Sequence, residues 1–188
     1  MTTENDTRNH VADLYWLAFL LTEHEDLSIE IAADSAVSGD YASPFFSDWM
    51  RGWQRRLVIG RALTAIHDEL ADSARRTQLA RANSSARSSV APRNWSLNPD
   101  TTKADLQQAL LAIDLFPRAV LLLRVFEGMR MEDAATLLGA DPALIRKAQA
   151  IGLRELTANL AGKPVANISR REAPNKVCSW LRSTVVCH

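Results

Sequence analysis

The N-terminal part of the chain alternates apolar and polar residues with the spacing of a helix. Within residues 10–25, the positions that form one apolar face are Val11, Leu14, Tyr15, Ala18 and Leu21. Intervals of three and four residues predict an amphipathic helix with a wide apolar face. A second helix is predicted over residues 25–38, and Gly39 and Pro44 end it.

The next stretch, residues 45–82, continues the helical pattern. It predicts one long helix, or two helices in line with a weak point at Gly52 or Gly60. Residues 83–103 are rich in Ser, Asn and Pro and have little periodicity. We therefore expect a linker there, preceded by a first helical domain over residues 1–82.

The clearest periodicity lies in residues 104–161, where Leu106, Ala109, Leu110 and Ile113 form one stripe. Pro117 is well placed in the first turn of the next helix. Residues 120–126 are almost wholly apolar, which predicts a buried, central helix that ends at Gly128. The pattern as a whole predicts an all-α protein with two small helical domains, the second containing four helices.

The end of this second domain predicts a short helix over residues 131–138, a turn, and a last helix to about Leu160. Asp141 is a favourable N-cap and Pro142 a favourable first helical residue. Arg130 is a poor N-cap for the short helix. Residues 162–188 form a basic tail whose conformation the sequence does not predict.

Charge is distributed unevenly along the chain, although the 22 basic and 22 acidic residues balance. Residues 1–48 contain one basic and ten acidic residues, and residues 49–103 contain ten basic and four acidic residues. Residues 104–161 are nearly balanced. A net charge of zero argues against a protein that binds nucleic acid alone. An acidic head followed by an arginine-rich stretch is a strong asymmetry, although solvated faces that cluster by chance would give the same pattern.

Several classes of protein are disfavoured. The strongest apolar run is eight residues, well below the roughly 20 that span a bilayer, and the polar N-terminus has no secretory signal pattern. We expect a cytoplasmic protein. Cys178, Cys187 and His188 match no zinc spacing and are interpreted as free thiols with a terminal His. No catalytic set or cofactor motif is present, so we expect neither an enzyme nor a cofactor.

A helix-turn-helix frame occurs in the last two predicted helices. Such a frame needs a small residue in its first helix, a residue that can take the turn four positions on, and an apolar residue six positions later. Ala135, Gly139 and Ile145 meet these needs, with Leu138 and Ala148 as further core positions. The alternative is an ordinary helical hairpin.

Residues 104–161 resemble the C-terminal domain of bacterial RNA polymerase sigma factors, in the extracytoplasmic-function (ECF) class of the sigma-70 superfamily. The segments that carry the resemblance are "ALLAIDLFPRAVLLLRVFEG", "DAATLLGADPALIRK" and "GLRELTANL". The N-terminal half is similar to the family's other domain in "LYWLAFLLTEHEDLSIEIAADSAVS" and "WQRRLVIGRAL". It departs from the family pattern at Ser38, where Gln is usual, and at Gly60, where Asn is usual.

The resemblance implies a protein that binds core RNA polymerase and directs it to double-stranded promoter DNA, with an anti-sigma factor as a further conceivable partner. The residues implied to read the minus-35 element are Pro142, Ala143, Leu144, Arg146, Lys147 and Gln149. Those implied to contact the minus-10 element are Trp53, Arg55, Arg56 and Arg61. Those implied to bind core polymerase are Asp34, Val37 and Ser38.

Each of these roles has a simpler alternative. Arg146 and Lys147 could be solvated helix charges, and Trp53 and Trp49 could lie in the core with surface arginines around them. Asp34 could belong to a solvated acidic face. A reading helix with so few charges suits a protein tethered to DNA through polymerase, because linked sites can each be weak. The alternative function is a sigma-derived regulator or interaction protein that no longer initiates transcription.

Overall fold

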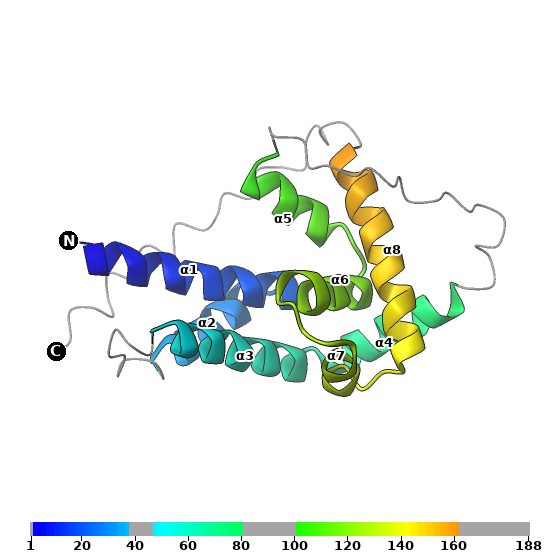
Figure 1. The fold of residues 1–188 in the computed structure, drawn as a ribbon, viewed down its shortest axis with the longest axis horizontal. Helices are drawn as coiled ribbons and strands as arrows, with labels where there is room; N and C mark the ends of the chain where they lie inside the picture. The colour runs from blue at the N-terminus through cyan, green and yellow to red at the C-terminus, as the bar shows by residue number, and fades with distance from the viewer. Residues whose placement is uncertain (1, 38–46, 81–100, 162–188) are drawn as a thin grey trace. The chain divides into compact units, whose positions relative to one another are not determined.

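A computed structural model describes residues 2–37, 47–80 and 101–161, and all regular structure in these segments is helical (Figure 1). The helices are α1 (Thr2–Thr22), α2 (Glu25–Val37), α3 (Ser47–Ala65), α4 (His67–Leu79), α5 (Lys103–Leu111), α6 (Leu115–Leu121), a π-helical turn (Leu122–Phe126), α7 (Met131–Leu137) and α8 (Pro142–Ala161). The predicted all-α class is therefore confirmed. Most of the expected linker, the basic tail and its two cysteines lie outside the described residues.

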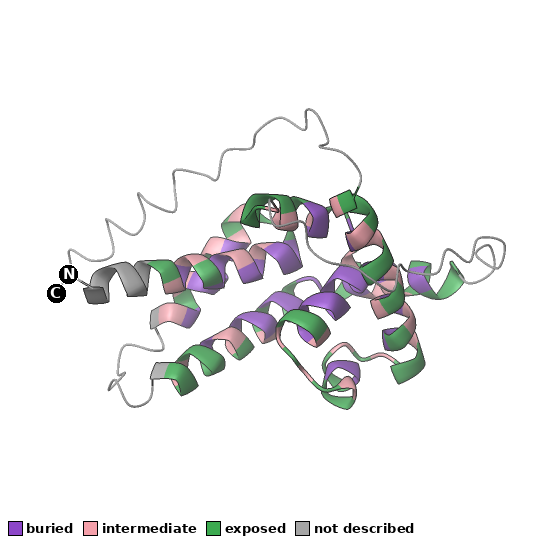
Figure 2. Cartoon of the chain, turned by 45° about the horizontal axis from the view of Figure 1, so that its top comes forward, coloured by how far each residue is buried: buried purple, intermediate pink, exposed green. Residues whose placement is uncertain are grey.

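The described residues fall into two compact units, divided after Ala62. In the N-terminal unit, α1 packs along α2 through an apolar core that includes Leu14, Leu21 and Ile31. Figure 2 shows buried positions and exposed positions on different faces of these helices. The amphipathic pattern that predicted the first two helices thus matches their observed burial.

The interruption between α3 and α4 falls at Ile66, not at Gly52 or Gly60. Both glycines lie inside α3, and a Cβ added at either would meet no atom within 4 Å. Glycine weakens a helix interior by roughly 1 kcal/mol, an amount that packing readily offsets. Val58 and Ile59 are buried next to Gly60 and anchor α3 through this region. The expected weak points were therefore wrong, because tertiary packing outweighs local propensity.

Helix α4 belongs to the C-terminal unit, although the sequence grouped it with residues 1–82. Its packing partners are α6 and α8. The buried side of α4 consists of Leu70, Ser73 and Thr77, at intervals of three and four residues. Two of these three residues are polar, so the hydrophobic pattern gave no signal that this side would be buried.

Helix α5 begins with a capping box. The Thr102 hydroxyl accepts a hydrogen bond from the Asp105 backbone N–H at 3.2 Å, and the Asp105 carboxylate accepts one from the Thr102 backbone N–H at 2.9 Å. The pKa of Asp105 lies below its usual value, because its carboxylate accepts hydrogen bonds from the Thr102 hydroxyl, at 2.6 Å, and from the Thr102 backbone N–H. The arrangement satisfies two donors at the helix start, which fixes the direction in which the chain enters α5.

Helix α6 is the centre of the C-terminal unit and is buried along most of its length (Figure 2). The prediction of a buried helix holds as far as Leu123, but Val125 and Phe126 are exposed. They lie in the π-helical turn, where wider winding rotates side chains away from the positions an α-helix would give them. Gly128 has φ of 64° and ends the helix as expected.

The fully buried Arg118 of α6 was not anticipated by the sequence. Its Nη1 donates hydrogen bonds to the carbonyl oxygens of Leu111 and Ile113, at 3.2 and 3.1 Å. The last carbonyl groups of a helix lack partners within the helix. Arg118 supplies donors to the end of α5 and so fixes α5 against the central helix.

No helix in the described segments is both long and apolar enough to cross a membrane.

Candidate nucleic-acid interface

The helix-turn-helix frame is formed by α7 and α8, which pack against each other. Ala135 and Ile145 are buried, as the frame requires, and Ala148 is fully buried beside them. Gly139 has φ of 57°, a left-handed conformation that residues with a side chain rarely adopt. The three positions that defined the frame in the sequence therefore have the expected burial and backbone geometry.

Close packing fixes the position of α8 on α6. Gly152 is buried, and a Cβ there would lie 2.8 Å from side-chain atoms of Leu121 and 3.0 Å from the Pro117 carbonyl oxygen. Near the far end, the Asn159 amide donates to the Ala109 carbonyl oxygen at 2.9 Å. These contacts hold α8 in a fixed position on α5 and α6 and leave its other face exposed.

The carboxylate of Asp141, the residue just before α8, caps the first turn of the helix. Asp141 accepts a hydrogen bond from the Ala143 backbone N–H at 2.7 Å, and Pro142 begins the helix. This confirms the predicted cap and first residue. A helix start is a favourable place for an anion. Here Asp141 already occupies that place, so it opposes the approach of a DNA phosphate to the same N–H groups.

The residues expected to read DNA do not share one environment. Pro142, Ala143 and Arg146 are exposed, whereas Leu144, Lys147 and Gln149 are partly buried. Arg146 is therefore the charged side chain that α8 presents most openly near its start. Further along, Leu153 and Arg154 are also exposed.

Lys147 is bound within the protein. Its amine donates hydrogen bonds to the carbonyl oxygens of Thr77 and Gln78, the second at 3.1 Å. These carbonyls lie at the C-terminal end of α4, where the helix dipole favours a cation. The described structure therefore shows Lys147 stabilising the end of α4, a role that the sequence did not suggest.

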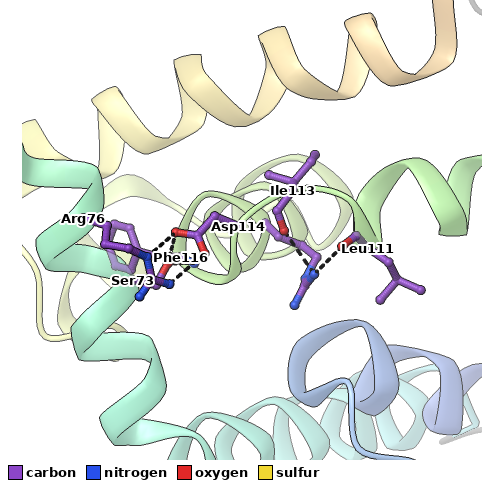
Figure 3. A network of polar contacts seen from close by, with 7 residues as sticks. Ser73, Arg76, Leu111, Ile113, Asp114 and Phe116 are labelled. Carbon is purple, nitrogen blue, oxygen red and sulfur yellow. Dashed lines mark hydrogen bonds and ion pairs between the residues drawn. The ribbon is translucent and has the colours of Figure 1, made fainter. Parts of the chain in front are cut away.

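Helix α4 is also joined to the start of α6 by a polar network (Figure 3). The Asp114 carboxylate accepts hydrogen bonds from Ser73 Oγ at 2.7 Å and from Arg76 Nη2 at 2.8 Å. The Ser73 hydroxyl in turn accepts from the Phe116 backbone N–H at 2.8 Å. Burial acts to raise the pKa of Asp114, but the bonds from Arg76 and Ser73 outweigh it and leave the pKa below its usual value.

Glu155 on α8 has the opposite perturbation. Burial raises its pKa, the positive charge of Arg154 lowers it, and the negative charge of Asp114 raises it further. The net shift is upward. Asp114 is therefore stabilised in its charged form, whereas Glu155 is destabilised in its charged form.

Acidic residues lie at the start of both helices of the frame. Glu132 and Asp133 lie in the first turn of α7, and Asp141 caps α8. Arg130, which begins α7 without a side-chain cap, donates to Asp133 at 2.8 and 3.2 Å. The basic side chain at the start of α7 is thus engaged with a neighbouring acid, which weakens the positive potential that DNA backbone binding needs.

The candidate minus-10 residues lie on α3. Trp53 is 36% exposed and Trp49, one turn earlier, is 65% exposed, so the alternative in which both indoles are core residues is wrong in this structure. Arg56 is exposed and Arg55 is partly buried. Exposed indoles beside arginine are the side chains that stack with and bind single-stranded nucleic acid. Trp49 was not among the expected contact residues.

The structure brings together two residues that were expected to serve different partners. Arg61 Nη1 lies 3.1 Å from Asp34 Oδ2, in an ion pair between α3 and α2. Nearby, the buried Gln54 donates to the Ala36 carbonyl oxygen at 3.3 Å and lies 2.6 Å from His10 Nε2. Val37 is the last residue of α2, and Ser38 lies outside the described residues.

No cluster of three or more His, Cys, Asp or Glu side chains suited to a metal ion occurs in the described segments. No protein-family model, curated protein or solved structure matches the chain.

Proposed function

We propose that the protein is a sigma-factor-like transcription initiation protein that binds core RNA polymerase in the cytoplasm and directs it to promoter DNA. The observation that carries the proposal is the α7–α8 geometry. Ala135 and Ile145 are buried, Gly139 is left-handed, and α8 presents Arg146 to solvent. This geometry accompanies the sequence resemblance over residues 104–161 and suits a helix that enters the major groove.

Weak charge on α8 is compatible with this function. A sigma factor acts while bound to polymerase, so each DNA contact forms at high effective concentration and needs little affinity of its own. The exposed indoles of Trp49 and Trp53 and the exposed Arg56 support a second contact, with unpaired promoter DNA.

A second candidate function is a sigma-derived regulator that binds polymerase or an anti-sigma factor without initiating transcription. The observation that favours it is the use of three expected contact residues inside the protein. Asp34 and Arg61 bind each other, and Lys147 binds the end of α4. The acidic residues at the starts of α7 and α8 also favour this second candidate.

The first experiment is binding of the purified protein to bacterial core RNA polymerase that lacks sigma factor, measured by gel filtration and native gel. Under either candidate function that involves polymerase, a stable complex forms at micromolar concentration. Absence of a complex rejects the initiation proposal. A mixture with an unrelated helical protein of similar size serves as the control for non-specific association.

The second experiment separates the two candidates. The complex is given fragmented genomic DNA and nucleotides, and the transcript starts are sequenced. The initiation proposal predicts a defined set of starts that is lost in Arg146→Ala and kept in Arg75→Ala, which removes an exposed arginine from α4. A complex that forms but yields no defined starts supports the regulator.

A further inference from the structure

The contact between α4 and α8 bears on how many basic groups the candidate reading helix offers to DNA. Lys147 and Arg146 are adjacent in sequence, yet Arg146 is exposed and Lys147 is partly buried against α4. The Lys147 amine donates to the carbonyl oxygens of Thr77 and Gln78. Thr77 is itself buried, so the amine is drawn toward the α4 side of α8.

We propose that docked α4 withholds Lys147 from DNA, and that release of α4 adds this amine to the contacts made by α8. The inference rests on the proposed role of α8 as the DNA-reading helix. It makes α4 an internal regulator of DNA affinity, with the C-terminal carbonyl groups of α4 competing against DNA phosphates for one ammonium group.

The attachment of α4 is suited to release. Its polar network uses Arg76, whose side chain is 60% exposed, and Asp114, whose side chain is 43% exposed. Exposed ion pairs of this kind contribute little to stability and weaken in salt. The buried side of α4 adds Leu70, Ser73 and Thr77. A helix of 13 residues is also only marginally stable on its own, so released α4 would lose hydrogen-exchange protection.

The test uses the full chain and two substitutions on α4 that leave α7 and α8 unchanged. Arg76→Glu places a negative charge beside Asp114 and is designed to release α4. Arg75→Glu makes the same change of charge one residue earlier, at a side chain that pairs with Asp72 of α4 itself. The two variants therefore differ in α4 docking and match in net charge.

Two readouts are combined. Hydrogen–deuterium exchange over residues 67–79 reports release of α4, and fluorescence anisotropy with a labelled random-sequence duplex of about 30 base pairs reports DNA affinity at several salt concentrations. We expect faster exchange in Arg76→Glu alone. We also expect several-fold tighter DNA binding than in Arg75→Glu, with a salt dependence steeper by about one phosphate contact. Adding Lys147→Gln to each variant should abolish this difference.

Four results would overturn the inference. One is that Arg76→Glu shows faster exchange over α4 but binds DNA with the same affinity as Arg75→Glu. Another is an equal loss of affinity when Lys147→Gln is added to either variant, because Lys147 would then reach DNA with α4 docked. The third is unchanged exchange both in Arg76→Glu and in Ser73→Asp, which brings a second carboxylate to Asp114. The fourth is that α4 is released but no variant binds DNA at any salt, because released Lys147 then adds no affinity; the reading role of α8 is judged separately, by the loss of defined transcript starts in Arg146→Ala.

Discussion

The guanidinium of Arg61 binds the carboxylate of Asp34 across α3 and α2, with 3.1 Å between Nη1 and Oδ2. Under the proposed function, Arg61 contacts promoter DNA and Asp34 contacts polymerase. Each residue can therefore contact its expected partner only if the ion pair between Arg61 and Asp34 breaks. The pair links the two expected surfaces of the N-terminal unit.

Loss of this ion pair should change folding stability little. The Arg61 and Asp34 side chains are 43% and 62% exposed, and exposed pairs contribute about 0–1 kcal/mol. A double-mutant cycle of Arg61→Ala and Asp34→Ala, followed by urea unfolding, should give a coupling free energy in this range. The coupling should shrink in 0.5 M salt. A larger, salt-insensitive coupling would show that the pair is a structural element.

Substitutions of Asp34 and Arg61 should affect polymerase binding differently. If Asp34 contacts polymerase, Asp34→Asn weakens the complex several-fold, while Arg61→Gln leaves it intact or strengthens it by releasing the carboxylate. Glu30→Gln removes an exposed charge from the same helix and serves as the control. Equal effects of Asp34→Asn and Glu30→Gln would reject a specific role for Asp34.

Two glycine substitutions should change stability in opposite directions. Gly60→Ala should raise the free energy of unfolding by up to about 1 kcal/mol, because the site lies inside α3 and a Cβ there meets no atom within 4 Å. Gly152→Ala should lower it by about 1–3 kcal/mol, because the Cβ would clash with Leu121 and Pro117. Urea unfolding followed by circular dichroism measures both. A stabilising Gly152→Ala would contradict the close packing of α8 on α6.

The two perturbed carboxylates should give opposite pH dependence. The raised pKa of Glu155 means that its charged form destabilises the fold, and this cost disappears as pH falls toward the ordinary glutamate value of 4.5. Glu155→Gln should therefore raise the thermal midpoint at pH 7, and the gain should vanish below about pH 4.5. A gain that is constant with pH would exclude the charge of Glu155 as its source.

The lowered pKa of Asp114 should give a pH dependence of stability opposite to that of Glu155. Its charged form stabilises the fold above the ordinary aspartate value of 3.8, and that contribution is lost as pH falls further through the lowered folded-state pKa. Asp114→Asn should therefore lower the thermal midpoint at pH 7, and the loss should diminish below about pH 3.8. Thermal scans from pH 3 to pH 7 on wild type and both variants measure the two effects together.

Local sequence patterns were sufficient to predict much of the structure of the C-terminal unit. Asp141 and Pro142 mark the start of α8, and Gly128 and Gly139 mark chain reversals, because each acts through its own backbone conformation or a neighbouring N–H group. Ala135 and Ile145 are recognisable because close helix packing demands a given size at a given spacing. The helix-turn-helix frame could therefore be predicted before any long-range contact was known.

Contacts between distant residues could not be predicted in this way. Ser73 and Asp114 are 41 residues apart, and Lys147 lies 69 and 70 residues from its carbonyl partners. Polar residues of these types are usually solvated, so their positions carried no sign of burial or bonding. The assignment of α4 to the C-terminal unit depends on such contacts. For the same reason, the sequence could not reveal that Lys147 is already engaged.

The charge on Asp141 should limit DNA binding by α8. Asp141→Asn keeps an oxygen that can accept from the Ala143 N–H but removes the negative charge from the helix start. If α8 enters the major groove with this end first, the variant binds a random-sequence duplex several-fold more tightly, because phosphate approach is no longer opposed. Asp141→Ala removes the cap as well, which should lower stability by about 0.5–2 kcal/mol.

Fluorescence anisotropy at two salt concentrations measures the effect of Asp141→Asn, with Glu30→Gln on α2 as a control for the same change in net charge. A gain confined to Asp141→Asn, and reduced at high salt, places DNA at the start of α8. Equal gains in both variants would mean that net charge alone governs binding. The N-terminal turn of α8 would then not be a DNA contact, and Arg146 would lose its proposed role.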